Sequence, residues 1–120
     1  MKILVVDDEE MILSLTRKIL ERVGHEVLTA ESGQAALDIC RDSDPPPGMA
    51  IVDLTMAGMT GIETLRRLRA LYADIPVIIS SGHLSESVEV PEALQAHTAT
   101  LQKPFQASDI LDKIRILTGD

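Results

Sequence analysis

The stretch Met49-Ala50-Ile51-Val52-Asp53-Leu54 decides how the rest of this chain is interpreted. Its apolar run, residues 50–52, favours a strand that is buried on both faces, as strands of a parallel sheet are. Asp53 follows the run directly, and the residues after it, Thr55-Met56-Ala57-Gly58-Met59-Thr60-Gly61, predict a turn. Open sheets of alternating strands and helices place their chemistry at the carboxyl ends of the strands, so Asp53 is a candidate functional residue.

Other runs of residues that favour strands also end in polar side chains. These runs and the residues that follow them are 3–6 with Asp7-Asp8, 75–79 with Ser80-Ser81-Gly82, and 98–102 with Lys103-Pro104. An acid pair, a lone acid, a hydroxyl group and a lysine therefore all fall at strand ends. Because acid-tipped parallel strands can converge, we expect these side chains to lie near Asp53.

Apolar spacing along the chain predicts five strands that alternate with five helices. We expect strands at residues 3–6, 25–30, 50–52, 75–80 and 98–102, and helices at 9–23, 33–40, 61–72, 91–96 and 107–117. Strict alternation of this kind predicts an α/β fold with a parallel sheet covered on both sides through right-handed crossovers. The Pro-rich residues 42–48 predict an exposed loop. With no internal repeat and no second domain, residues 1–120 are expected to form a single domain.

Residue types also predict local details. Ser32 is a candidate helix N-cap, Gly24 a candidate residue just past a helix end, and Pro91 a candidate first helical residue. The first helix carries a stripe of apolar residues at helical spacing, namely Ile12, Leu15, Ile19 and Val23. In the third helix we expect three arginines to face water, Arg66 within reach of Glu63; they are Arg66, Arg67 and Arg69.

Composition restricts the class of protein. The chain has 120 residues, of which 45% are hydrophobic, 25% charged and only 2% aromatic, so we expect one soluble domain with an aliphatic core. Its net charge of −8 argues against nucleic-acid binding, which favours a basic surface. The single cysteine, Cys40, excludes an internal disulfide. No apolar run approaches a membrane span, and Met1-Lys2-Ile3 does not open a signal peptide, so we expect a cytoplasmic protein that binds no membrane.

The carboxylates Asp7, Asp8 and Asp53 predict a metal site. Hard oxygen ligands at separate strand ends suit Mg²⁺, which keeps several waters and takes few protein carboxylates. The alternative for Asp7 and Asp8 is that they only start a loop and favour the next helix, and on their own the two interpretations are about even. The matching context of Asp53 favours the metal site. Clustered carboxylates also repel one another, so we expect at least one raised pKa without metal.

Asp53 can also act as a nucleophile toward phosphorus, giving an acyl phosphate. The incoming phosphoryl group needs a cation and hydrogen-bond donors around its oxygens. Lys103 is the candidate cation, its alternative being a solvated surface lysine. Ser81 offers a hydroxyl group and Gly82 an uncrowded backbone N–H, although Ser81-Gly82 alone would be interpreted as a plain turn. Whether the Lys103-Pro104 bond is cis or trans is left open.

These motifs together resemble the receiver domain of bacterial two-component response regulators over the whole chain. The matching segments are residues 3–9, Asp53-Leu54-Thr55-Met56 with Gly58-Met59-Thr60-Gly61, Ser81-Gly82, and Lys103-Pro104-Phe105. The resemblance implies a flavodoxin-like fold, a three-layer sandwich whose five-stranded parallel sheet has the order 2-1-3-4-5. It also implies that Asp53 accepts phosphate from a histidine kinase or a histidine phosphotransfer protein.

The resemblance implies a role for each site residue. Mg²⁺ would be held by the side chains of Asp8 and Asp53 and the Thr55 backbone carbonyl, with Asp7 acting through water. The phosphoryl oxygens would be contacted by Lys103, Ser81 and the backbone N–H groups of Leu54 and Gly82.

The chain also departs from the family pattern. Ala57 replaces the usual proline, Ala96-His97 replaces Gly-Ala, Pro91 falls inside the fourth helix, and Thr100 replaces an aromatic residue. Thr100 is too small to fill or vacate a pocket, so we expect no aromatic rotamer switch and a phosphate response concentrated in residues 82–96. The segment Leu101-Gln102-Lys103-Pro104-Phe105 is similar to receivers attached to hybrid sensor kinases. His83, two residues past Ser81, is as consistent with a surface histidine as with a residue that shapes water access.

Two other classes of function compete with a phosphoacceptor module that turns over no external substrate. A Mg²⁺-dependent phosphohydrolase with an aspartyl-phosphate intermediate would need a second carboxylate in an Asp-x-Asp pattern, and Asp53-Leu54-Thr55 lacks it. A phosphate-independent interaction module would not need the full set Asp8, Asp53, Ser81 and Lys103. The effector, the donor and the oligomeric state do not follow from the sequence.

Overall fold

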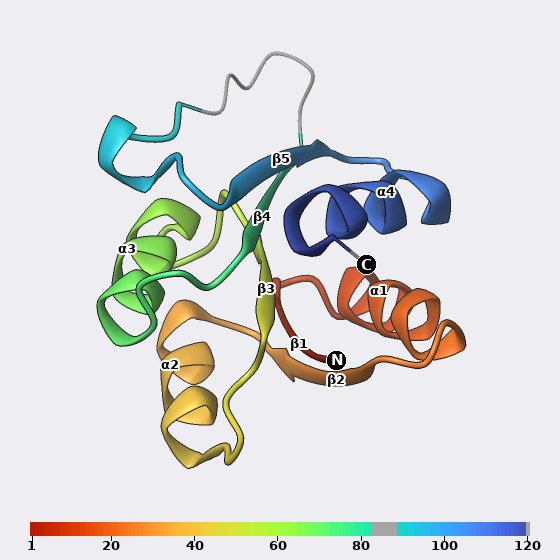
Figure 1. The fold of residues 1–120 in the computed structure, drawn as a ribbon, viewed down its shortest axis with the longest axis horizontal. Helices are drawn as coiled ribbons and strands as arrows, with labels where there is room; N and C mark the ends of the chain where they lie inside the picture. The colour runs from red at the N-terminus through yellow and green to blue at the C-terminus, as the bar shows by residue number, and fades with distance from the viewer. Residues whose placement is uncertain (83–88, 120) are drawn as a thin grey trace.

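A single parallel sheet organises the computed structural model, which describes residues 1–82 and 89–119 (Figure 1). Its five strands have the order β2-β1-β3-β4-β5, which confirms the order implied by the family resemblance. The strands are β1 (Lys2–Val6), β2 (Glu26–Ala30), β3 (Met49–Asp53), β4 (Val77–Ser81) and β5 (Thr98–Gln102). β1 and β3 are almost entirely apolar, and β4 is apolar before Ser80, as is typical of inner strands with both faces covered.

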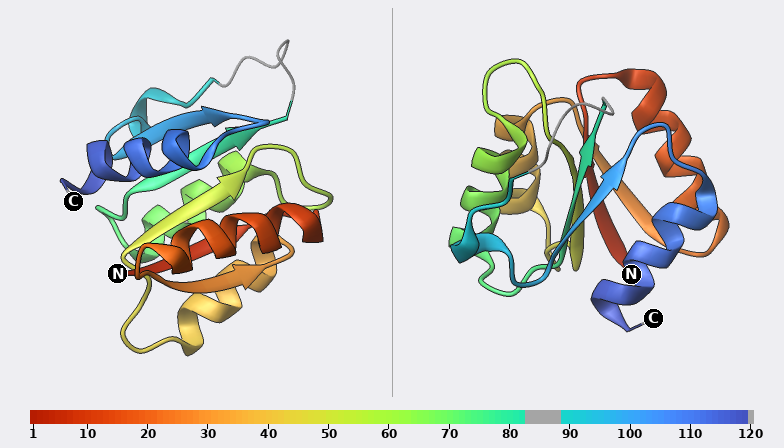
Figure 2. Two further views of the ribbon diagram at one scale, coloured as in Figure 1. Left: turned by 90° about the vertical axis from the view of Figure 1, so that its right-hand side faces the viewer. Right: turned by 90° about the horizontal axis from the view of Figure 1, so that it is seen from above.

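Helices cover both faces of the sheet. The described residues form α1 (Glu10–Arg22), α2 (Gly33–Asp42), α3 (Gly61–Leu71) and α4 (Ala107–Thr118), and a short 3₁₀ helix, η1 (Glu92–Leu94). Figure 2 shows α1 and α4 on one face and α2 and α3 on the other, so the architecture is the predicted three-layer sandwich. Within the described residues, no helix is long and apolar enough to cross a membrane.

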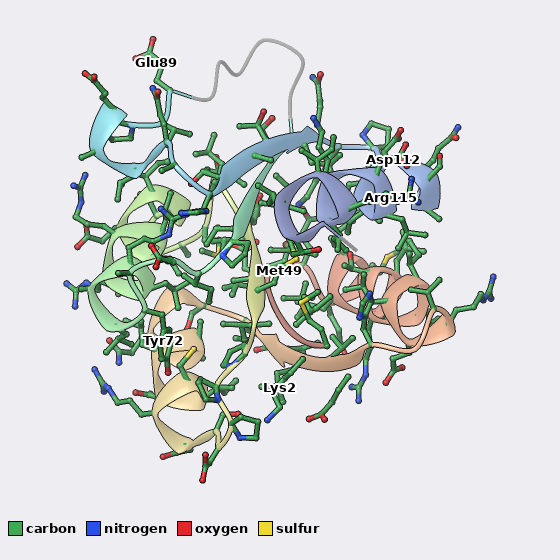
Figure 3. The ribbon with its side chains drawn as sticks, viewed as in Figure 1. Lys2, Met49, Tyr72, Glu89, Asp112 and Arg115 are labelled. Atoms are coloured by element: carbon green, nitrogen blue, oxygen red, sulfur yellow. The ribbon has the colours of Figure 1, made fainter. Side chains whose placement is uncertain are left out.

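Two aliphatic clusters fill the space between the layers. Alternate residues of a strand point to opposite faces, so Leu4 and Val6 join the α2–α3 cluster while Ile3 and Val5 join the α1–α4 cluster. Met49 lies fully buried in the second cluster, whereas charged side chains such as Asp112 and Arg115 lie at the outside (Figure 3). The core is therefore aliphatic, as the composition predicts.

Two predicted helix ends are confirmed. The Ser32 Oγ accepts from the Ala35 N–H at 3.1 Å, which caps α2. After α1, Gly24 has φ +94° and its N–H donates to the Glu21 carbonyl, while the His25 N–H donates to the Leu20 carbonyl. This pair of bonds is the glycine-dependent ending that the sequence predicts.

The buried face of α1 differs from the predicted stripe. Leu13, Thr16 and Leu20 are buried, whereas Leu15 and Val23 are 49% and 50% exposed. Both sets keep helical spacing, so periodicity alone could not choose between them. The packing of α1 on the sheet buries the residues that follow the predicted ones by one position in the sequence.

Four strand starts also differ, and β1 and β3 each begin one residue before the predicted start, at Lys2 and Met49. β4 begins at Val77 rather than residue 75, because Pro76 has no N–H to donate to the sheet. Pro76 still contributes its carbonyl, which accepts from the Ala50 N–H at 3.0 Å. β4 extends to Ser81, and β2 begins at Glu26, one residue after the predicted start.

The predicted fourth helix at 91–96 is wrong in extent. Only the single 3₁₀ turn of η1 forms there, and Pro91 precedes it in an extended conformation, with ψ 141°. A segment this short gains few helical hydrogen bonds for the residues it orders, and only Leu94 reaches the core within it. The predicted phosphate response at 82–96 falls partly on residues 83–88, which lie outside the described residues, as does His83.

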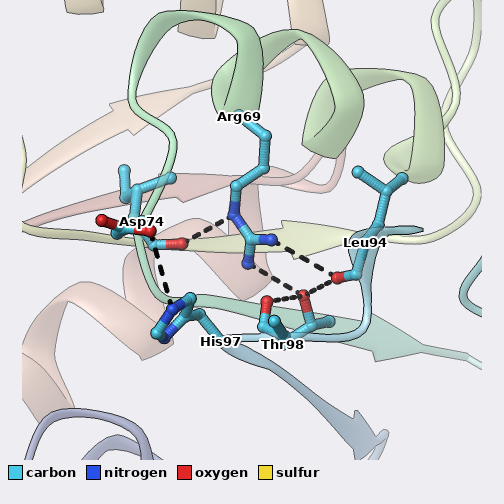
Figure 4. A network of polar contacts seen from close by, with 7 residues as sticks. Arg69, Asp74, Leu94, His97 and Thr98 are labelled. Atoms are coloured by element: carbon cyan, nitrogen blue, oxygen red, sulfur yellow. Dashed lines mark hydrogen bonds and ion pairs between the residues drawn. The ribbon is translucent and has the colours of Figure 1, made fainter. Parts of the chain in front are cut away.

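The prediction that Arg69 faces water is wrong. Arg69 is half-buried and donates to the Ile75 carbonyl, the Leu94 carbonyl and the Thr98 hydroxyl at 2.9, 3.4 and 2.9 Å (Figure 4). Arg66 and Arg67 are exposed as predicted, and both pair with Glu63. Arg69 thus joins α3 to the amino ends of β4 and β5.

Candidate functional site

Four strands deliver polar side chains to one edge of the sheet. Asp7 follows β1, Asp53 is the last residue of β3, Ser81 the last of β4, and Lys103 follows β5. The strands are parallel and in matched register, with Asp53 beside Ser80 and Ser81 beside Gln102. The sequence prediction that these strand ends converge is therefore confirmed.

Three carboxylates form the acidic part of this edge. One oxygen from each of Asp7, Asp8 and Asp53 lies within 4.8 Å of the others. Asp7 and Asp53 are 2% and 5% exposed, whereas Asp8 is open to solvent. The set can receive a cation from the Asp8 side, because the other two carboxylates are enclosed by protein.

Lys103 spans two of these carboxylates. Its Nζ lies 2.6 Å from Asp7 Oδ2 and 3.4 Å from Asp53 Oδ1, with Glu9 Oε1 further away at 3.9 Å. The lysine side chain is only 11% exposed, which excludes the alternative of a solvated surface lysine. The Lys103-Pro104 bond that follows is cis.

Burial and charge shift the acid–base properties of the site. Burial, followed by the charge of Asp7, raises the pKa of Asp53 from 3.8 to about 6, and Lys103 only partly offsets these effects. The predicted raised pKa is thus present, with burial as its largest single cause and repulsion from Asp7 and Asp8 adding to it. Burial lowers the pKa of Lys103, yet the hydrogen bonds and charges of Asp7 and Asp53 together outweigh burial and raise that pKa overall.

Backbone amides that the sequence analysis missed orient the acids. The Glu9 N–H donates to Asp7 Oδ1 at 2.9 Å, and the Ala57 N–H donates to Asp8 Oδ2 at 3.4 Å. The first bond could have been predicted, because aspartate commonly accepts from the amide two residues on. The second joins residues 49 positions apart and has no signal in the sequence.

Glycine shapes the loop between Asp53 and α3. A Cβ on Gly61 would overlap the carbonyl oxygen of Asp53 and lie 2.7 Å from Leu54 Cα. The Gly61 N–H donates to the Leu54 carbonyl at 3.0 Å, and the Thr60 hydroxyl caps α3 by accepting from the Glu63 N–H. This close packing holds Asp53 at the base of a short closed loop.

Of the remaining predicted site groups, those of Ser81, Gly82 and Thr55 are compatible with their predicted roles and the Leu54 N–H is not. Ser81 is 4% exposed at the end of β4, and Gly82 is exposed with no atom within 4 Å of where a Cβ would stand. Thr55 is exposed on the loop after Asp53. The Leu54 N–H, however, donates to the Ser80 carbonyl at 2.8 Å, so this amide belongs to the sheet and does not fit the predicted phosphoryl contact.

A partly apolar groove of about 360 Å³ lies beside the acids. It is lined by Lys103 and Gly82 of the site and by Glu9, Ile12, Leu15, Pro104 and Phe105. A larger groove of about 530 Å³ lies between α1, β2 and α2, away from Lys103. The acidic site therefore has an accessible apolar margin on one side.

Comparison with known proteins decides the family. The family model for the response regulator receiver domain matches residues 3–115. The chain belongs to this receiver family. Receiver domains bind Mg²⁺ at an acidic pocket and interact with histidine kinases and phosphotransfer proteins. They typically act as phosphoacceptor switches in two-component systems rather than as conventional enzymes.

Individual relatives agree with this assignment. The chain is 34% identical over 118 residues to the C4-dicarboxylate transport transcriptional regulatory protein DctD of Pseudomonas aeruginosa, covering 95% of the chain and 24% of that protein. It is 31% identical over 115 residues to sporulation initiation phosphotransferase F of Bacillus subtilis, covering 95% of the chain and 90% of that protein. It thus spans a quarter of the first relative and most of the second.

Solved structures share the fold. A response regulator receiver domain protein from Clostridium thermocellum superimposes with a TM-score of 0.86 at 32% identity, covering 98% of this chain and 94% of that one. The receiver fold places the acids and the lysine of this chain at the carboxyl edge of the sheet. The clustered carboxylate oxygens are the hard donors that Mg²⁺ prefers, so the residues present fit this ion.

Proposed function

We propose that Asp53 accepts a phosphoryl group from a histidine kinase or a histidine phosphotransfer protein in a Mg²⁺-dependent reaction. The observation that carries this proposal is the position of the Lys103 ammonium group, 2.6 Å from Asp7 and 3.4 Å from Asp53 at a carboxyl edge that holds three acids. In this proposal residues 1–120 form one cytoplasmic receiver domain. The domain binds no nucleic acid itself and turns over no external substrate.

Each site residue has a role in this reaction. Bound Mg²⁺ would offset the negative charge of the phosphoryl oxygens. Asp8, Asp53 and the Thr55 carbonyl would hold the ion, and Asp7 would act on it through water. Asp7 also accepts from Lys103, and this bond would keep the ammonium group near the oxygens of the incoming phosphoryl group.

The chemical step transfers the phosphoryl group from nitrogen to oxygen. An Asp53 oxygen bonds to phosphorus, and the bond between phosphorus and the donor imidazole nitrogen breaks with its electron pair returning to that nitrogen. With a pKa of about 6, Asp53 is mostly ionised at neutral pH and so is a competent nucleophile. Lys103, the Ser81 hydroxyl and the Gly82 N–H would stabilise the charge that develops on the transferred group.

The apolar groove beside Lys103 supports the proposal that the phosphoryl donor is a protein. A histidine that reaches Asp53 brings its own surface against the margin of the site, where Ile12, Leu15 and Phe105 offer apolar contact. We therefore expect Leu15→Glu to slow transfer from a phosphorylated histidine phosphotransfer protein by about tenfold, the effect of losing one good apolar contact. Phosphorylation by acetyl phosphate should not change, because that donor needs no protein surface.

Ile116→Glu is the matched control for this variant. Ile116 is also a large exposed apolar side chain, 74% exposed, but it lies on α4 away from the groove. Transfer to both variants at the rate of the unmutated chain would remove the groove from the proposal while leaving Asp53 as the acceptor.

Acyl phosphate mapping tests the acceptor itself. The chain is incubated with acetyl phosphate and Mg²⁺, the acyl phosphate is trapped with borohydride, and the labelled residue is identified by mass spectrometry. We expect label on Asp53 and none in Asp53→Asn. Label on another aspartate of the unmutated chain would overturn the assignment, and steady release of phosphate from small phosphoesters would favour the phosphohydrolase.

A further inference from the structure

One backbone amide on the loop after Asp53 contacts the exposed carboxylate of the site. The Ala57 N–H donates to Asp8 Oδ2 at 3.4 Å, which is longer than the usual N–H···O bond of roughly 2.7–3.2 Å. Asp7, in contrast, accepts from the Glu9 N–H at 2.9 Å and from Lys103 at 2.6 Å. Within the described residues no other hydrogen bond reaches the Asp8 carboxylate, so Ala57 alone orients it.

The loop that carries this amide is itself held in place. Its base is closed by the bond from the Gly61 N–H to the Leu54 carbonyl, and Gly61 packs directly on the Asp53 backbone. Gly58, directly after Ala57, has φ +79°, a conformation that glycine adopts without strain. The loop therefore presents the Ala57 amide to Asp8 from a position that β3 and α3 set.

We propose that the Ala57 N–H is a positioning group for Asp8 and raises the affinity of the site for Mg²⁺. This inference rests on the proposed function, in which Asp8 is a ligand of the ion. An exposed aspartate otherwise samples several rotamers, and binding a cation would have to restrict them. The amide holds one oxygen while the carboxylate keeps its charge and its second oxygen for the metal, which is how hydrogen bonds behind a ligand support metal sites.

The role belongs to the backbone and not to the methyl side chain. Proline, the usual residue at this position in the pattern that the chain resembles, has no N–H and cannot supply the bond. The inference therefore separates this chain from receivers with the usual pattern. It also links the metal to the loop that begins at Asp53 and ends at Gly61.

Replacing the amide by an ester tests the inference directly. Lactic acid in place of Ala57 removes the N–H and keeps the methyl group, and Mg²⁺ binding is measured by calorimetric titration. We expect the Kd for Mg²⁺ to rise roughly three- to tenfold, at or below the lower end of the usual effect because the bond is long. Ala57→Gly removes the methyl group and keeps the N–H. Its Kd for Mg²⁺ should stay within about twofold of the value for the unmodified chain, a difference of a few tenths of a kcal/mol. Ala57→Pro is a second way to remove the donor and should weaken binding in the same direction.

The same replacement in an Asp8→Ala background separates positioning from a general structural effect. If the amide acts through Asp8, its removal has no further effect on Mg²⁺ affinity once the carboxylate is gone. In the unmodified chain, the Ala57 amide resonance should also shift on Asp8→Ala. An unchanged Kd in the ester variant, or a loss of affinity that persists without Asp8, would overturn the inference and leave the proposed function standing. A chain that binds no Mg²⁺ at all would overturn both.

Discussion

The sheet has one edge formed by the carboxyl ends of its strands and one formed by their amino ends. A half-buried cationic side chain lies at each of these two edges, and the two differ in what surrounds them. At the carboxyl ends of the strands, Lys103 faces the carboxylates of Asp7, Asp53 and, further away, Glu9. At the amino ends, Arg69 faces two backbone carbonyls and the Thr98 hydroxyl, all of them neutral. Each cation joins strand ends to a neighbouring element.

The charge balance at the two edges shows why only one of them is suited to reversible binding. One ammonium group does not neutralise three clustered acids, and Asp53 keeps a raised pKa of about 6, caused chiefly by burial. The surplus negative charge is relieved when a cation binds. Around Arg69, neutral acceptors occupy the guanidinium group, and burial lowers the pKa of Arg69 although the charge of Asp74 partly offsets this effect. The contacts at that edge hold α3, β4 and β5 together.

The largest expected effect comes from removing the lysine. We expect Lys103→Ala to remain folded but to lower the rate of Asp53 phosphorylation by acetyl phosphate about 100-fold, the usual effect of removing one charge-stabilising group. The level of borohydride-trapped acyl phosphate measures it. Lys18→Ala, at an exposed position on α1, is the control. If Lys103→Ala is phosphorylated as fast as the unmutated chain, Lys103 has no role in phosphorylation that Arg69 lacks, and the comparison of the two edges fails.

Removing the Arg69 side chain should lower stability and leave phosphorylation nearly unchanged, the reverse of the result expected for Lys103→Ala. We expect Arg69→Ala to lower the free energy of unfolding by about 2 kcal/mol, because buried carbonyls lose their donor, and the melting temperature by about 5–10 °C. Phosphorylation of Asp53 should stay within about twofold, since a stability change of this size leaves the chain folded. Arg66→Ala is a matched control on the same helix, where an exposed ion pair contributes about 0.5 kcal/mol or less. Equal melting temperatures for the two variants would show that Arg69 does not hold this edge.

The raised pKa of Asp53 gives a pH-dependent test of the charge surplus. Between 3.8 and about 6 the folded chain keeps a proton that the unfolded chain releases, so stability from this group is present below pH 3.8 and is lost as pH rises through 6. In metal-free buffer, Asp53→Asn should therefore gain on the order of 1–3 kcal/mol at pH 7, given about 1.4 kcal/mol per pKa unit. Denaturant unfolding at several pH values measures the gain, which should vanish near pH 4. A gain that is constant with pH would mean that titration of Asp53 is not its cause.

The smallest expected effect concerns the exposed acid. Asp8→Asn should gain about 0.5 kcal/mol in metal-free buffer, because one source of repulsion is removed from an exposed position. The variant should lose most of the rise in melting temperature that Mg²⁺ produces in the unmutated chain. Thermal unfolding with and without Mg²⁺ measures both. Equal Mg²⁺-induced shifts in the two proteins would contradict the placement of the ion at Asp8.

Sequence reasoning succeeded where a local pattern had one interpretation. The residues at the strand ends, the Ser32 cap and the Gly24 helix ending were all predicted from neighbouring residues and are present. It failed where two patterns were equally periodic or a polar residue had an unforeseen partner. The face of α1 and the burial of Arg69 are of this kind. The roles of the site residues stay predictions, in phosphoryl transfer for Asp53, Lys103, Ser81 and Gly82 and in metal binding for Asp7, Asp8, Asp53 and Thr55.

The sequence by itself determined which chemical groups stand at the ends of the strands, because apolar runs and the polar residues after them are neighbours along the chain. Only the tertiary structure decided which of these groups meet. Lys103 and Asp7 are 96 positions apart, Ala57 and Asp8 are 49 apart, and Arg69 and Thr98 are 29 apart. Contacts of this kind depend on strand order, register and the packing of helices on the sheet, none of which any single stretch of the chain specifies.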